Sequence, residues 1–195
     1  GMGIISSTLF ALLLPGQKVV SVKDTYGGTN KIFTEFLPRF NIEVVLCETD
    51  DTNAVETAIQ TGCRLLYLES PTNPTIKVVD IARLSSAARK TGATVVVDNT
   101  FATPINQNPL QLGADIVIHS ATKYLGGHSD VLGGVLAVKD PELNERLYFI
   151  QNATGAVMGP LESFLCARGL KTLELRVREQ CRTAARLADF LGSHA

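Results

Sequence analysis

Short runs of consecutive apolar residues are the feature of this sequence that most constrains its fold. Such runs are typical of parallel strands that helices cover on both faces, because strands with one wet face alternate apolar and polar residues. Helical patterns separate the runs, and Asp51 and Asp80 stand where helix N-caps are expected. This alternation predicts an α/β fold, with a mostly parallel sheet sandwiched by helices. We expect strands at 18–22, 43–46, 64–68, 94–97, 115–118 and 135–138, and helices at 5–14, 52–60, 81–90, 141–151, 160–168 and from 170 onward.

The composition is that of an ordinary globular chain and argues against several classes of partner. Of 195 residues, 45% are hydrophobic and 19% are charged, and the formal net charge is −1. Because this charge does not attract a phosphodiester backbone and no basic stripe is present, we expect no nucleic acid as a partner. The most apolar stretch, 4–14, is shorter than the ~18 residues of a membrane span. We therefore expect it to be a buried helix, with no membrane as a partner.

Cysteines and histidines follow no spacing typical of a metal site or a disulfide frame. The four cysteines include no Cys-x-x-Cys pair, and the three histidines lack ligand spacing. We expect no metal, and reduced core thiols in a cytoplasmic protein.

The last third of the chain is helical in pattern, with no further strand expected after residue 138. Its final helix carries several arginines, which we interpret as a solvated face. These are Arg176, Arg178, Arg182 and Arg186.

Polar side chains follow four of the expected strands, in the segments 23–29, 69–74, 98–100 and 119–123. In open α/β sheets a ligand binds beyond the carboxyl ends of the strands, so these segments meet at one edge. They supply an amine for an aldehyde, a carboxylate for a pyridine nitrogen, and hydroxyls for a phosphate. Pyridoxal 5'-phosphate has all three groups. Asp98 ends an apolar strand, so a lysine beside it is expected to be desolvated.

The run SATKYLGGHSD at 120–130 resembles the cofactor-lysine segment of the transsulfuration, or Cys/Met metabolism, enzymes that depend on pyridoxal phosphate. The segments YGGT at 26–29, ESPTNP at 69–74, VVVDNT at 95–100 and RGLKTL at 168–173 resemble the same family. It comprises cystathionine γ-synthase, cystathionine γ- and β-lyase, and methionine γ-lyase. The likeness spans this chain but only about half of the family's usual length.

The resemblance implies the large domain of the fold-type-I, PLP-dependent transferase-like enzymes, truncated at both ends. Residues 1–172 would form the cofactor-binding domain, incomplete at its N-terminus, and 173–195 the start of a long helix leading to a missing C-terminal domain. By the same comparison the sheet lacks its first strand. An unpaired edge is then expected at 134–138.

Roles for individual residues also come from the resemblance. Lys123 is similar to the lysine that binds the cofactor covalently and moves protons at the substrate Cα, and Asp98 to the partner of the pyridine nitrogen. Tyr26 is similar to the ring stacked on the cofactor, which also transfers a proton. The cofactor-binding set implied is Gly1, Met2, Tyr26, Asn73, Asp98, Thr100, Ser120, Thr122 and Lys123, with Lys123 and Tyr26 catalytic.

Structural alternatives stay open at several of these positions. Asp98 can serve only to cap the turn at Thr100, Asn73 can serve only the turn between two prolines, and Gly1-Met2 can match the phosphate motif by accident. Glu69 is either a brace for the site or the start of that turn, and we leave it out of the catalytic set.

The function implied is that of a PLP-dependent lyase or transferase acting by γ-elimination or γ-replacement on cystathionine or an activated homoserine. The family takes groups for the phosphate from a neighbouring subunit and an arginine for the substrate from a C-terminal domain, so this chain alone is expected to be weakly active or inactive. We expect a small amino-acid substrate and a homo-oligomer, dimer or tetramer, in the cytoplasm. Methionine γ-lyase and cystathionine β-lyase are alternatives; Gly28, where methionine γ-lyases usually carry cysteine, disfavours the former.

Readings outside this family have weaker support. Ser120 and Lys123 also form Ser-x-x-Lys, the nucleophile motif of penicillin-binding proteins and class A β-lactamases, but the Lys-Thr-Gly at 90–92 precedes that serine. No Gly-x-Gly-x-x-Gly follows the first strand, as a dinucleotide site requires. The non-enzymatic alternative is a folded fragment that binds no cofactor.

Overall fold

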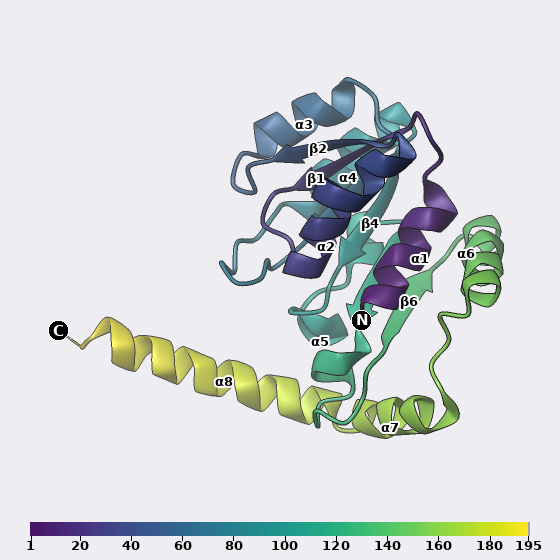
Figure 1. Ribbon diagram of the computed structural model, residues 1–195. Coiled ribbons are helices and arrows are strands. Elements are labelled where there is room, and N and C mark those ends of the chain that lie inside the picture. Colours follow the sequence, from purple (N-terminus) through teal and green to yellow (C-terminus); the bar gives the residue numbers. More distant parts are fainter. Residues whose placement is uncertain (195) are drawn as a thin grey trace.

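A computed structural model describes residues 1–194, in which helices flank a six-stranded sheet on both faces (Figure 1). The strand order is β2-β1-β3-β4-β5-β6, and every neighbouring pair is parallel except β5 and β6. The mostly parallel sheet is confirmed, and all expected strands are present with their ends within two residues of the prediction. Their bounds are β1 (Lys18–Val22), β2 (Glu43–Cys47), β3 (Leu65–Glu69), β4 (Thr94–Asp98), β5 (Ile116–Ser120) and β6 (Gly134–Val138).

The long helices match the predicted pattern. Asp51 and Asp80 cap α3 and α4 as expected, since each carboxylate accepts a backbone N–H three residues on, at 2.9 and 3.0 Å. The first helix spans 2–12 instead of the predicted 5–14. The helices are α1 (Met2–Leu12), α2 (Gly27–Lys31), α3 (Thr52–Gln60), α4 (Ile81–Thr91), α5 (Thr103–Asn106), α6 (Pro141–Thr154), α7 (Pro160–Leu170) and α8 (Leu173–Gly192).

A helical run after β1 was missed by the sequence analysis. Here α2 continues into the π-turn η1 (Ile32–Phe36) and the 3-10 turn η2 (Leu37–Phe40). Two glycines at its start and Pro38 near its end have low helix propensity, so the sequence carries a weak helical signal. Further short turns are η3 (Pro109–Leu112) and η4 (Ala121–Leu125).

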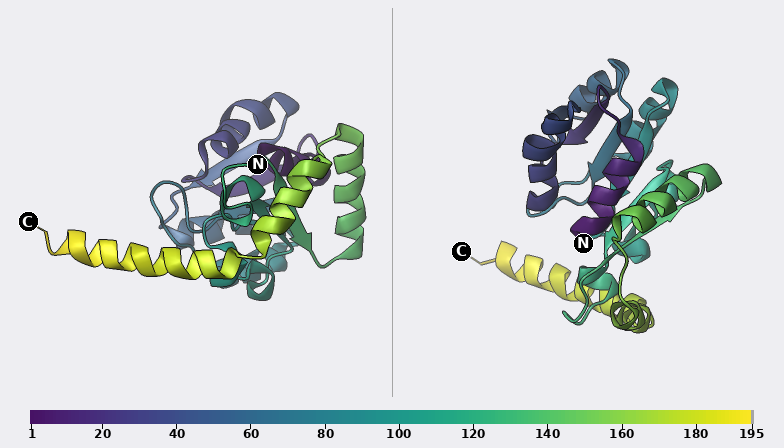
Figure 2. Two further views of the ribbon diagram at one scale, coloured as in Figure 1. Left: turned by 90° about the horizontal axis from the view of Figure 1, so that it is seen from below. Right: turned by 45° about the vertical axis from the view of Figure 1, so that its right-hand side comes forward.

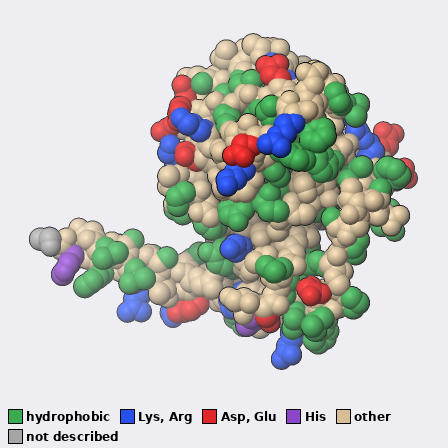
Figure 3. All heavy atoms as spheres, viewed as in Figure 1, with side chains coloured by type: hydrophobic (Ala, Val, Ile, Leu, Met, Phe, Trp, Pro, Cys, Tyr) green, Lys and Arg blue, Asp and Glu red, His purple; other side chains and the backbone are tan. Residues whose placement is uncertain are grey.

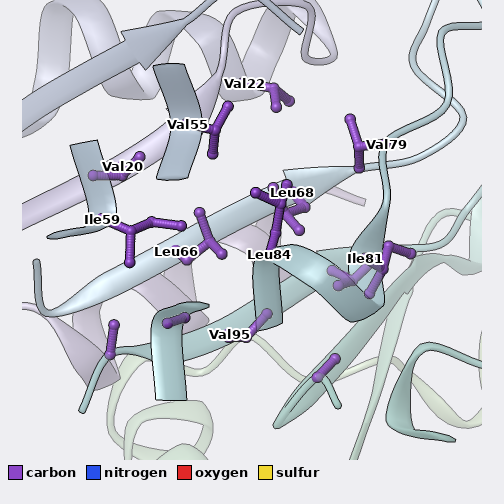
Figure 4. Close-up of a cluster of buried hydrophobic side chains, with 14 of the residues drawn as sticks. Val20, Val22, Val55, Ile59, Leu66, Leu68, Val79, Ile81, Leu84 and Val95 are labelled. Atoms are coloured by element: carbon purple, nitrogen blue, oxygen red, sulfur yellow. The ribbon is translucent and has the colours of Figure 1, made fainter. Parts of the chain in front are cut away.

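The sheet is buried on both faces, which explains why the strands are apolar at successive positions. On one face α3 and α4 pack over β-strand side chains in the cluster drawn in Figure 4, which includes Val20, Leu66 and Leu68. On the other face α1, α6 and the run after α2 cover a second cluster around Tyr67 and Phe33. Leu65, Leu66, Tyr67 and Leu68 are all completely buried, so β3 lies at the centre of the fold.

The C-terminal helix α8 leaves the body of the protein (Figures 1 and 2). Only Leu173 and Val177 near its start are buried, in a third cluster with α7 and η4. Beyond them the helix extends as an arm with uncovered apolar side chains (Figure 3), among them Leu187 and Phe190. The division at residue 172 stays a prediction, and Ala195, the last residue of the predicted segment 173–195, lies outside the described residues.

The structure describes several further features that bear on the sequence-based expectations. Strand β6 lies at one edge of the sheet, as expected, and pairs only with β5 among residues 1–194. In the same residues no helix is both long and apolar enough to cross a membrane, and no three His, Cys, Asp or Glu side chains gather as a metal would require. The four cysteines are free, but the expectation of core thiols is wrong for Cys181, which is exposed on α8.

Candidate functional site

A cavity of about 250 Å³ lies at the carboxyl ends of β3, β4 and β5. The strand order changes direction between β1 and β3, and such switch points are where open α/β sheets bind ligands. The cavity is slightly smaller than the ~300–1,000 Å³ typical of ligand pockets, which suits a small ligand. All the site residues proposed from the sequence line it: Gly1, Met2, Tyr26, Asn73, Asp98, Thr100, Ser120, Thr122 and Lys123.

A larger hollow of about 690 Å³ lies beside this cavity, between α1, β6 and α6. Its described lining is mostly small and apolar, and Tyr148 is its only ionisable side chain. Catalysis of proton transfer needs ionisable groups within reach of the substrate. The smaller cavity, which contains Glu69, Asp98 and Lys123, is therefore the candidate site.

Asp98 is a buried carboxylate at the end of β4. It is 6% exposed, and within residues 1–194 no cationic side chain forms a salt bridge with it. Burial raises the pKa of Asp98 above its usual value, and hydrogen bonds from Thr100 oppose that shift. Thr100 donates its N–H and its hydroxyl to Oδ1, at 3.0 and 2.5 Å. The capping role considered for Asp98 is thus real, and it engages Oδ1.

Hydroxyl groups and the start of α1 form a second part of the cavity wall. The Thr100 hydroxyl accepts the Ser120 N–H at 2.8 Å, and Ser120 Oγ accepts from the Gly1 nitrogen at 3.1 Å. Thr122 Oγ1 accepts the Gly133 N–H at 3.2 Å. The first N–H groups of a helix lack partners within it and carry the positive end of its dipole. This side of the cavity therefore suits an anion.

Tyr26 and Met2 also line the cavity, and Gly28 permits the close approach of their side chains. Tyr26 precedes α2 as its N-cap and is 45% exposed. A Cβ added to Gly28 would lie 2.7 Å from Met2 Sδ and 2.9 Å from Tyr26 Cε1. A side chain at position 28 would therefore displace one of these two residues.

Asn73 enters the cavity from the loop after β3. This loop contains two cis peptide bonds, Ser70–Pro71 and Asn73–Pro74, a point that the sequence left open. Glu69 accepts the backbone N–H of Tyr26 at 2.8 Å and of Asn73 at 3.2 Å. Of the two interpretations of Glu69, the geometry supports the brace.

Lys123 lies directly after β5 in the turn η4, where the backbone departs from helical geometry (φ −96°, ψ −123°). It lines the cavity together with Asp98. Its side chain is exposed, so the expectation of a desolvated lysine is wrong. The physical reason is that Lys123 lies beyond the end of β5, in η4, whereas Asp98 is still part of β4 and is 6% exposed.

Comparison with known proteins identifies the family. The profile of the Cys/Met metabolism PLP-dependent enzymes matches residues 1–195. The chain belongs to this family. It is 46% identical over 194 residues to the cystathionine gamma-lyase of Bacillus subtilis, and 48% identical over 194 residues to the cystathionine beta-lyase of the same species. Both matches cover 100% of this chain. They cover 51% of the gamma-lyase and 50% of the beta-lyase.

A solved structure agrees in fold with this member of the Cys/Met metabolism family. The cystathionine gamma synthase from Xanthomonas oryzae pv. oryzae in complex with cystathionine superposes with a TM-score of 0.97 at 39% identity, covering 100% of this chain and 50% of that one. The family and the fold expected from the sequence are thus confirmed. The chain spans about half the length of the curated relatives it matches.

The cofactor of the Cys/Met metabolism family, pyridoxal phosphate, fits the residues that line the cavity. Asp98 is a buried carboxylate with which no cationic side chain of residues 1–194 forms a salt bridge, and a protonated pyridine nitrogen would supply the opposite charge. The two hydroxyls of Ser120 and Thr122 lie beside the α1 N-terminus, as a phosphate requires. A free amine, that of Lys123, lines the same cavity and can bind an aldehyde.

The turn that carries Lys123 is held by α7 and α8, which the sequence analysis did not anticipate. The Arg176 guanidinium donates to the carbonyls of Tyr124 and Gly169, at 2.9 and 2.8 Å, and to the Thr172 hydroxyl at 3.0 Å. The prediction of a solvated arginine face is therefore wrong for Arg176, because main-chain oxygens from two other segments surround its guanidinium.

Gly169 brings α7 into contact with the same turn, and we expect Gly169→Ala to destabilise the fold by about 2–3 kcal/mol. An added Cβ would overlap the Gly126 carbonyl oxygen and lie 2.6 Å from that of Leu125, and main-chain atoms cannot rotate away. Urea unfolding measures the change. Gly192→Ala, where nothing lies within 4 Å, is the matched control, with an expected change below about 0.5 kcal/mol. Equal effects of the two substitutions would contradict the packing argument.

The cavity also contains residues that the sequence analysis did not select. Phe101, Leu132 and Pro71 line it. Phe101 follows the polar segment 98–100 directly, so its place in the sequence could have indicated that it lines the cavity. No sequence signal marked Leu132, because a single apolar residue in a loop resembles any other.

Proposed function

We propose that this chain carries the cofactor site of an enzyme that breaks or forms carbon–sulfur bonds, by γ-elimination or γ-replacement on cystathionine or an activated homoserine. The observation that supports this most strongly is that Lys123 and Asp98 line one cavity in a chain of the Cys/Met metabolism PLP-dependent family. The relatives named above are a cystathionine γ-lyase, a β-lyase and a γ-synthase.

Each residue has a role that its position suits. When bound, pyridoxal phosphate supplies an electron sink that stabilises negative charge at the substrate Cα. Lys123 holds the cofactor through its amine, and after release it removes and returns the Cα proton. Asp98 would keep a proton on the pyridine nitrogen, because a buried negative charge favours an opposite charge beside it.

The remaining residues hold the cofactor in place. Tyr26 would hold the cofactor ring and transfer the proton of the leaving group, while Asn73 would bind the ring oxygen. Thr100 fixes the Asp98 carboxylate through two hydrogen bonds. The phosphate is bound by Ser120, Thr122 and the main chain of Gly1 and Met2.

A second candidate, β-elimination from cystathionine, is favoured by one observation. The chain is as similar to a cystathionine beta-lyase, at 48%, as to a cystathionine gamma-lyase, at 46%. Residues that this chain has in common with both lyases therefore cannot decide which bond of cystathionine is cleaved. Methionine γ-lyase activity is disfavoured, because this chain carries Gly28 where methionine γ-lyases usually carry cysteine.

We further propose a cytoplasmic homo-oligomer with a small amino-acid substrate, built from a cofactor domain at 1–172 and a connecting helix from 173. Apolar side chains on α7 and α8 support association: Phe164 and Phe190 are 60% and 59% exposed.

We also propose that the chain alone is weakly active. Tyr26 and Lys123 are exposed to solvent, and a site open to water loses electrostatic stabilisation. Full-rate elimination from cystathionine by the chain alone would contradict this part of the proposal.

Binding of the cofactor tests the proposal directly. We expect the purified chain to turn yellow with pyridoxal phosphate, and borohydride reduction followed by peptide mapping to place one adduct on Lys123. Product analysis with cystathionine then separates β- from γ-elimination. No colour, or adducts spread evenly over exposed lysines such as Lys90, would favour the folded fragment that binds no cofactor.

A further inference from the structure

Glu69 is a buried carboxylate in the site to which the proposed function gives no role. It is the last residue of β3, is 6% exposed, and lines the cavity. Its two oxygens accept different main-chain N–H groups: Oε2 that of Tyr26 at 2.8 Å, and Oε1 that of Asn73 at 3.2 Å. One side chain therefore joins the segment after β1 to the segment after β3.

The two residues that Glu69 holds lie on different sides of the cavity. Tyr26 begins α2, and Asn73 belongs to the loop after β3. A carboxylate can accept on both oxygens, whereas a protonated acid or an amide presents a donor on one side. That donor would face an N–H, so the ionised side chain satisfies both contacts better than the protonated acid or an amide.

Ionisable groups from several elements face Glu69. Asp98 on β4 is its partner in the strand register, and Tyr67 on β3 is buried nearby. Lys123 from η4, the Tyr26 phenol and the Gly1 amino group line the same cavity. Burial, followed by the charge of Asp98, raises the pKa of Glu69 to about 7, against the effect of the two N–H groups. Both protonation forms are therefore populated near neutral pH.

We propose that Glu69 is a positioning residue whose carboxylate sets the spacing between the Tyr26 ring and the Asn73 amide, so that loss of its charge loosens the site and weakens cofactor binding. The positioning of Tyr26 and Asn73 by Glu69 concerns the chain alone. The effect on cofactor binding rests on the proposed function. The two halves are therefore tested separately.

The first test needs no cofactor. In amide NMR spectra of the chain, we expect the N–H signals of Tyr26 and Asn73 to titrate together with a midpoint near pH 7. In Glu69→Gln neither signal should titrate in that range. The control Glu48→Gln, an exposed carboxylate beyond β2 that pairs with Lys23, should behave as the unaltered chain. Absence of the titration in the unaltered chain, which requires no variant to fold, overturns the proposal.

The second test compares dissociation constants for pyridoxal phosphate. At pH 8 we expect Glu69→Gln to bind roughly tenfold more weakly than the unaltered chain, because one hydrogen bond to a charged group is lost. As the pH falls to 6 the glutamate takes up a proton, so the ratio should fall toward about two. A ratio that stays constant with pH indicates a merely structural role and overturns the proposal. If the unaltered chain binds no cofactor, the proposed function fails while the NMR result still decides the role of Glu69.

Discussion

In a Lys123→Ala variant we expect no borohydride-stable attachment of pyridoxal phosphate, and at least a ~10³-fold slower exchange of the substrate Cα hydrogen with deuterated water. By the proposed function, the substitution removes both the amine that binds the aldehyde and the base at Cα. Exchange is a better readout than full turnover, because the groups assigned to this step all lie within this chain. Peptide mapping and NMR of the amino acid measure the two effects.

The loss in Lys123→Ala can be separated from misfolding. The Lys123 side chain is exposed, so its removal is expected to change the free energy of unfolding by less than about 0.5 kcal/mol. Lys90→Ala, at an exposed position on α4, is the matched control and should keep attachment and exchange. Lys123→Arg retains the charge but cannot lose its proton, and should fail like the alanine variant. Equal cofactor binding by Lys123→Ala would contradict the assigned role.

The sheet was predictable because its physical cause is local. The central strands β1, β3, β4 and β5 are buried on both faces, and apolar runs therefore mark them. The caps of α3 and α4 were predictable for the same reason, since Asp51 and Asp80 bind N–H groups only three residues away. The run after β1 was missed because its glycines and proline weaken the helical signal, and contact with the buried core at Phe33 and Leu37 stabilises it instead.

Most of the residues that line the cavity were predictable, but their geometry was not. Parallel strands bring their carboxyl ends to one edge, so polar residues after several strands had to meet there. The environment of each group depended on distant segments. Arg176 binds the carbonyl of Tyr124, 52 residues away, and was therefore mistaken for a surface charge. Glu69 binds the Tyr26 N–H 43 residues away, so sequence alone left its role undecided.

Asp98→Asn should leave the fold and the attachment of the cofactor to Lys123 intact, yet slow Cα hydrogen exchange by about 10³-fold. The amide oxygen can still accept both hydrogen bonds of Thr100, and burial penalises the charged form of Asp98. The free energy of unfolding is therefore not expected to fall. What is lost is the negative charge that keeps the pyridine nitrogen protonated, and without that proton the ring withdraws electrons poorly.

The contrast between attachment and exchange makes the Asp98→Asn experiment specific. Asp80→Asn is the matched control, because asparagine caps a helix as well as aspartate does and this position is exposed. It should retain both properties. Unchanged exchange in Asp98→Asn would show that Asp98 only caps the turn at Thr100. Loss of attachment together with exchange would instead assign Asp98 to cofactor binding, because an electron sink acts only on a substrate that the cofactor already holds.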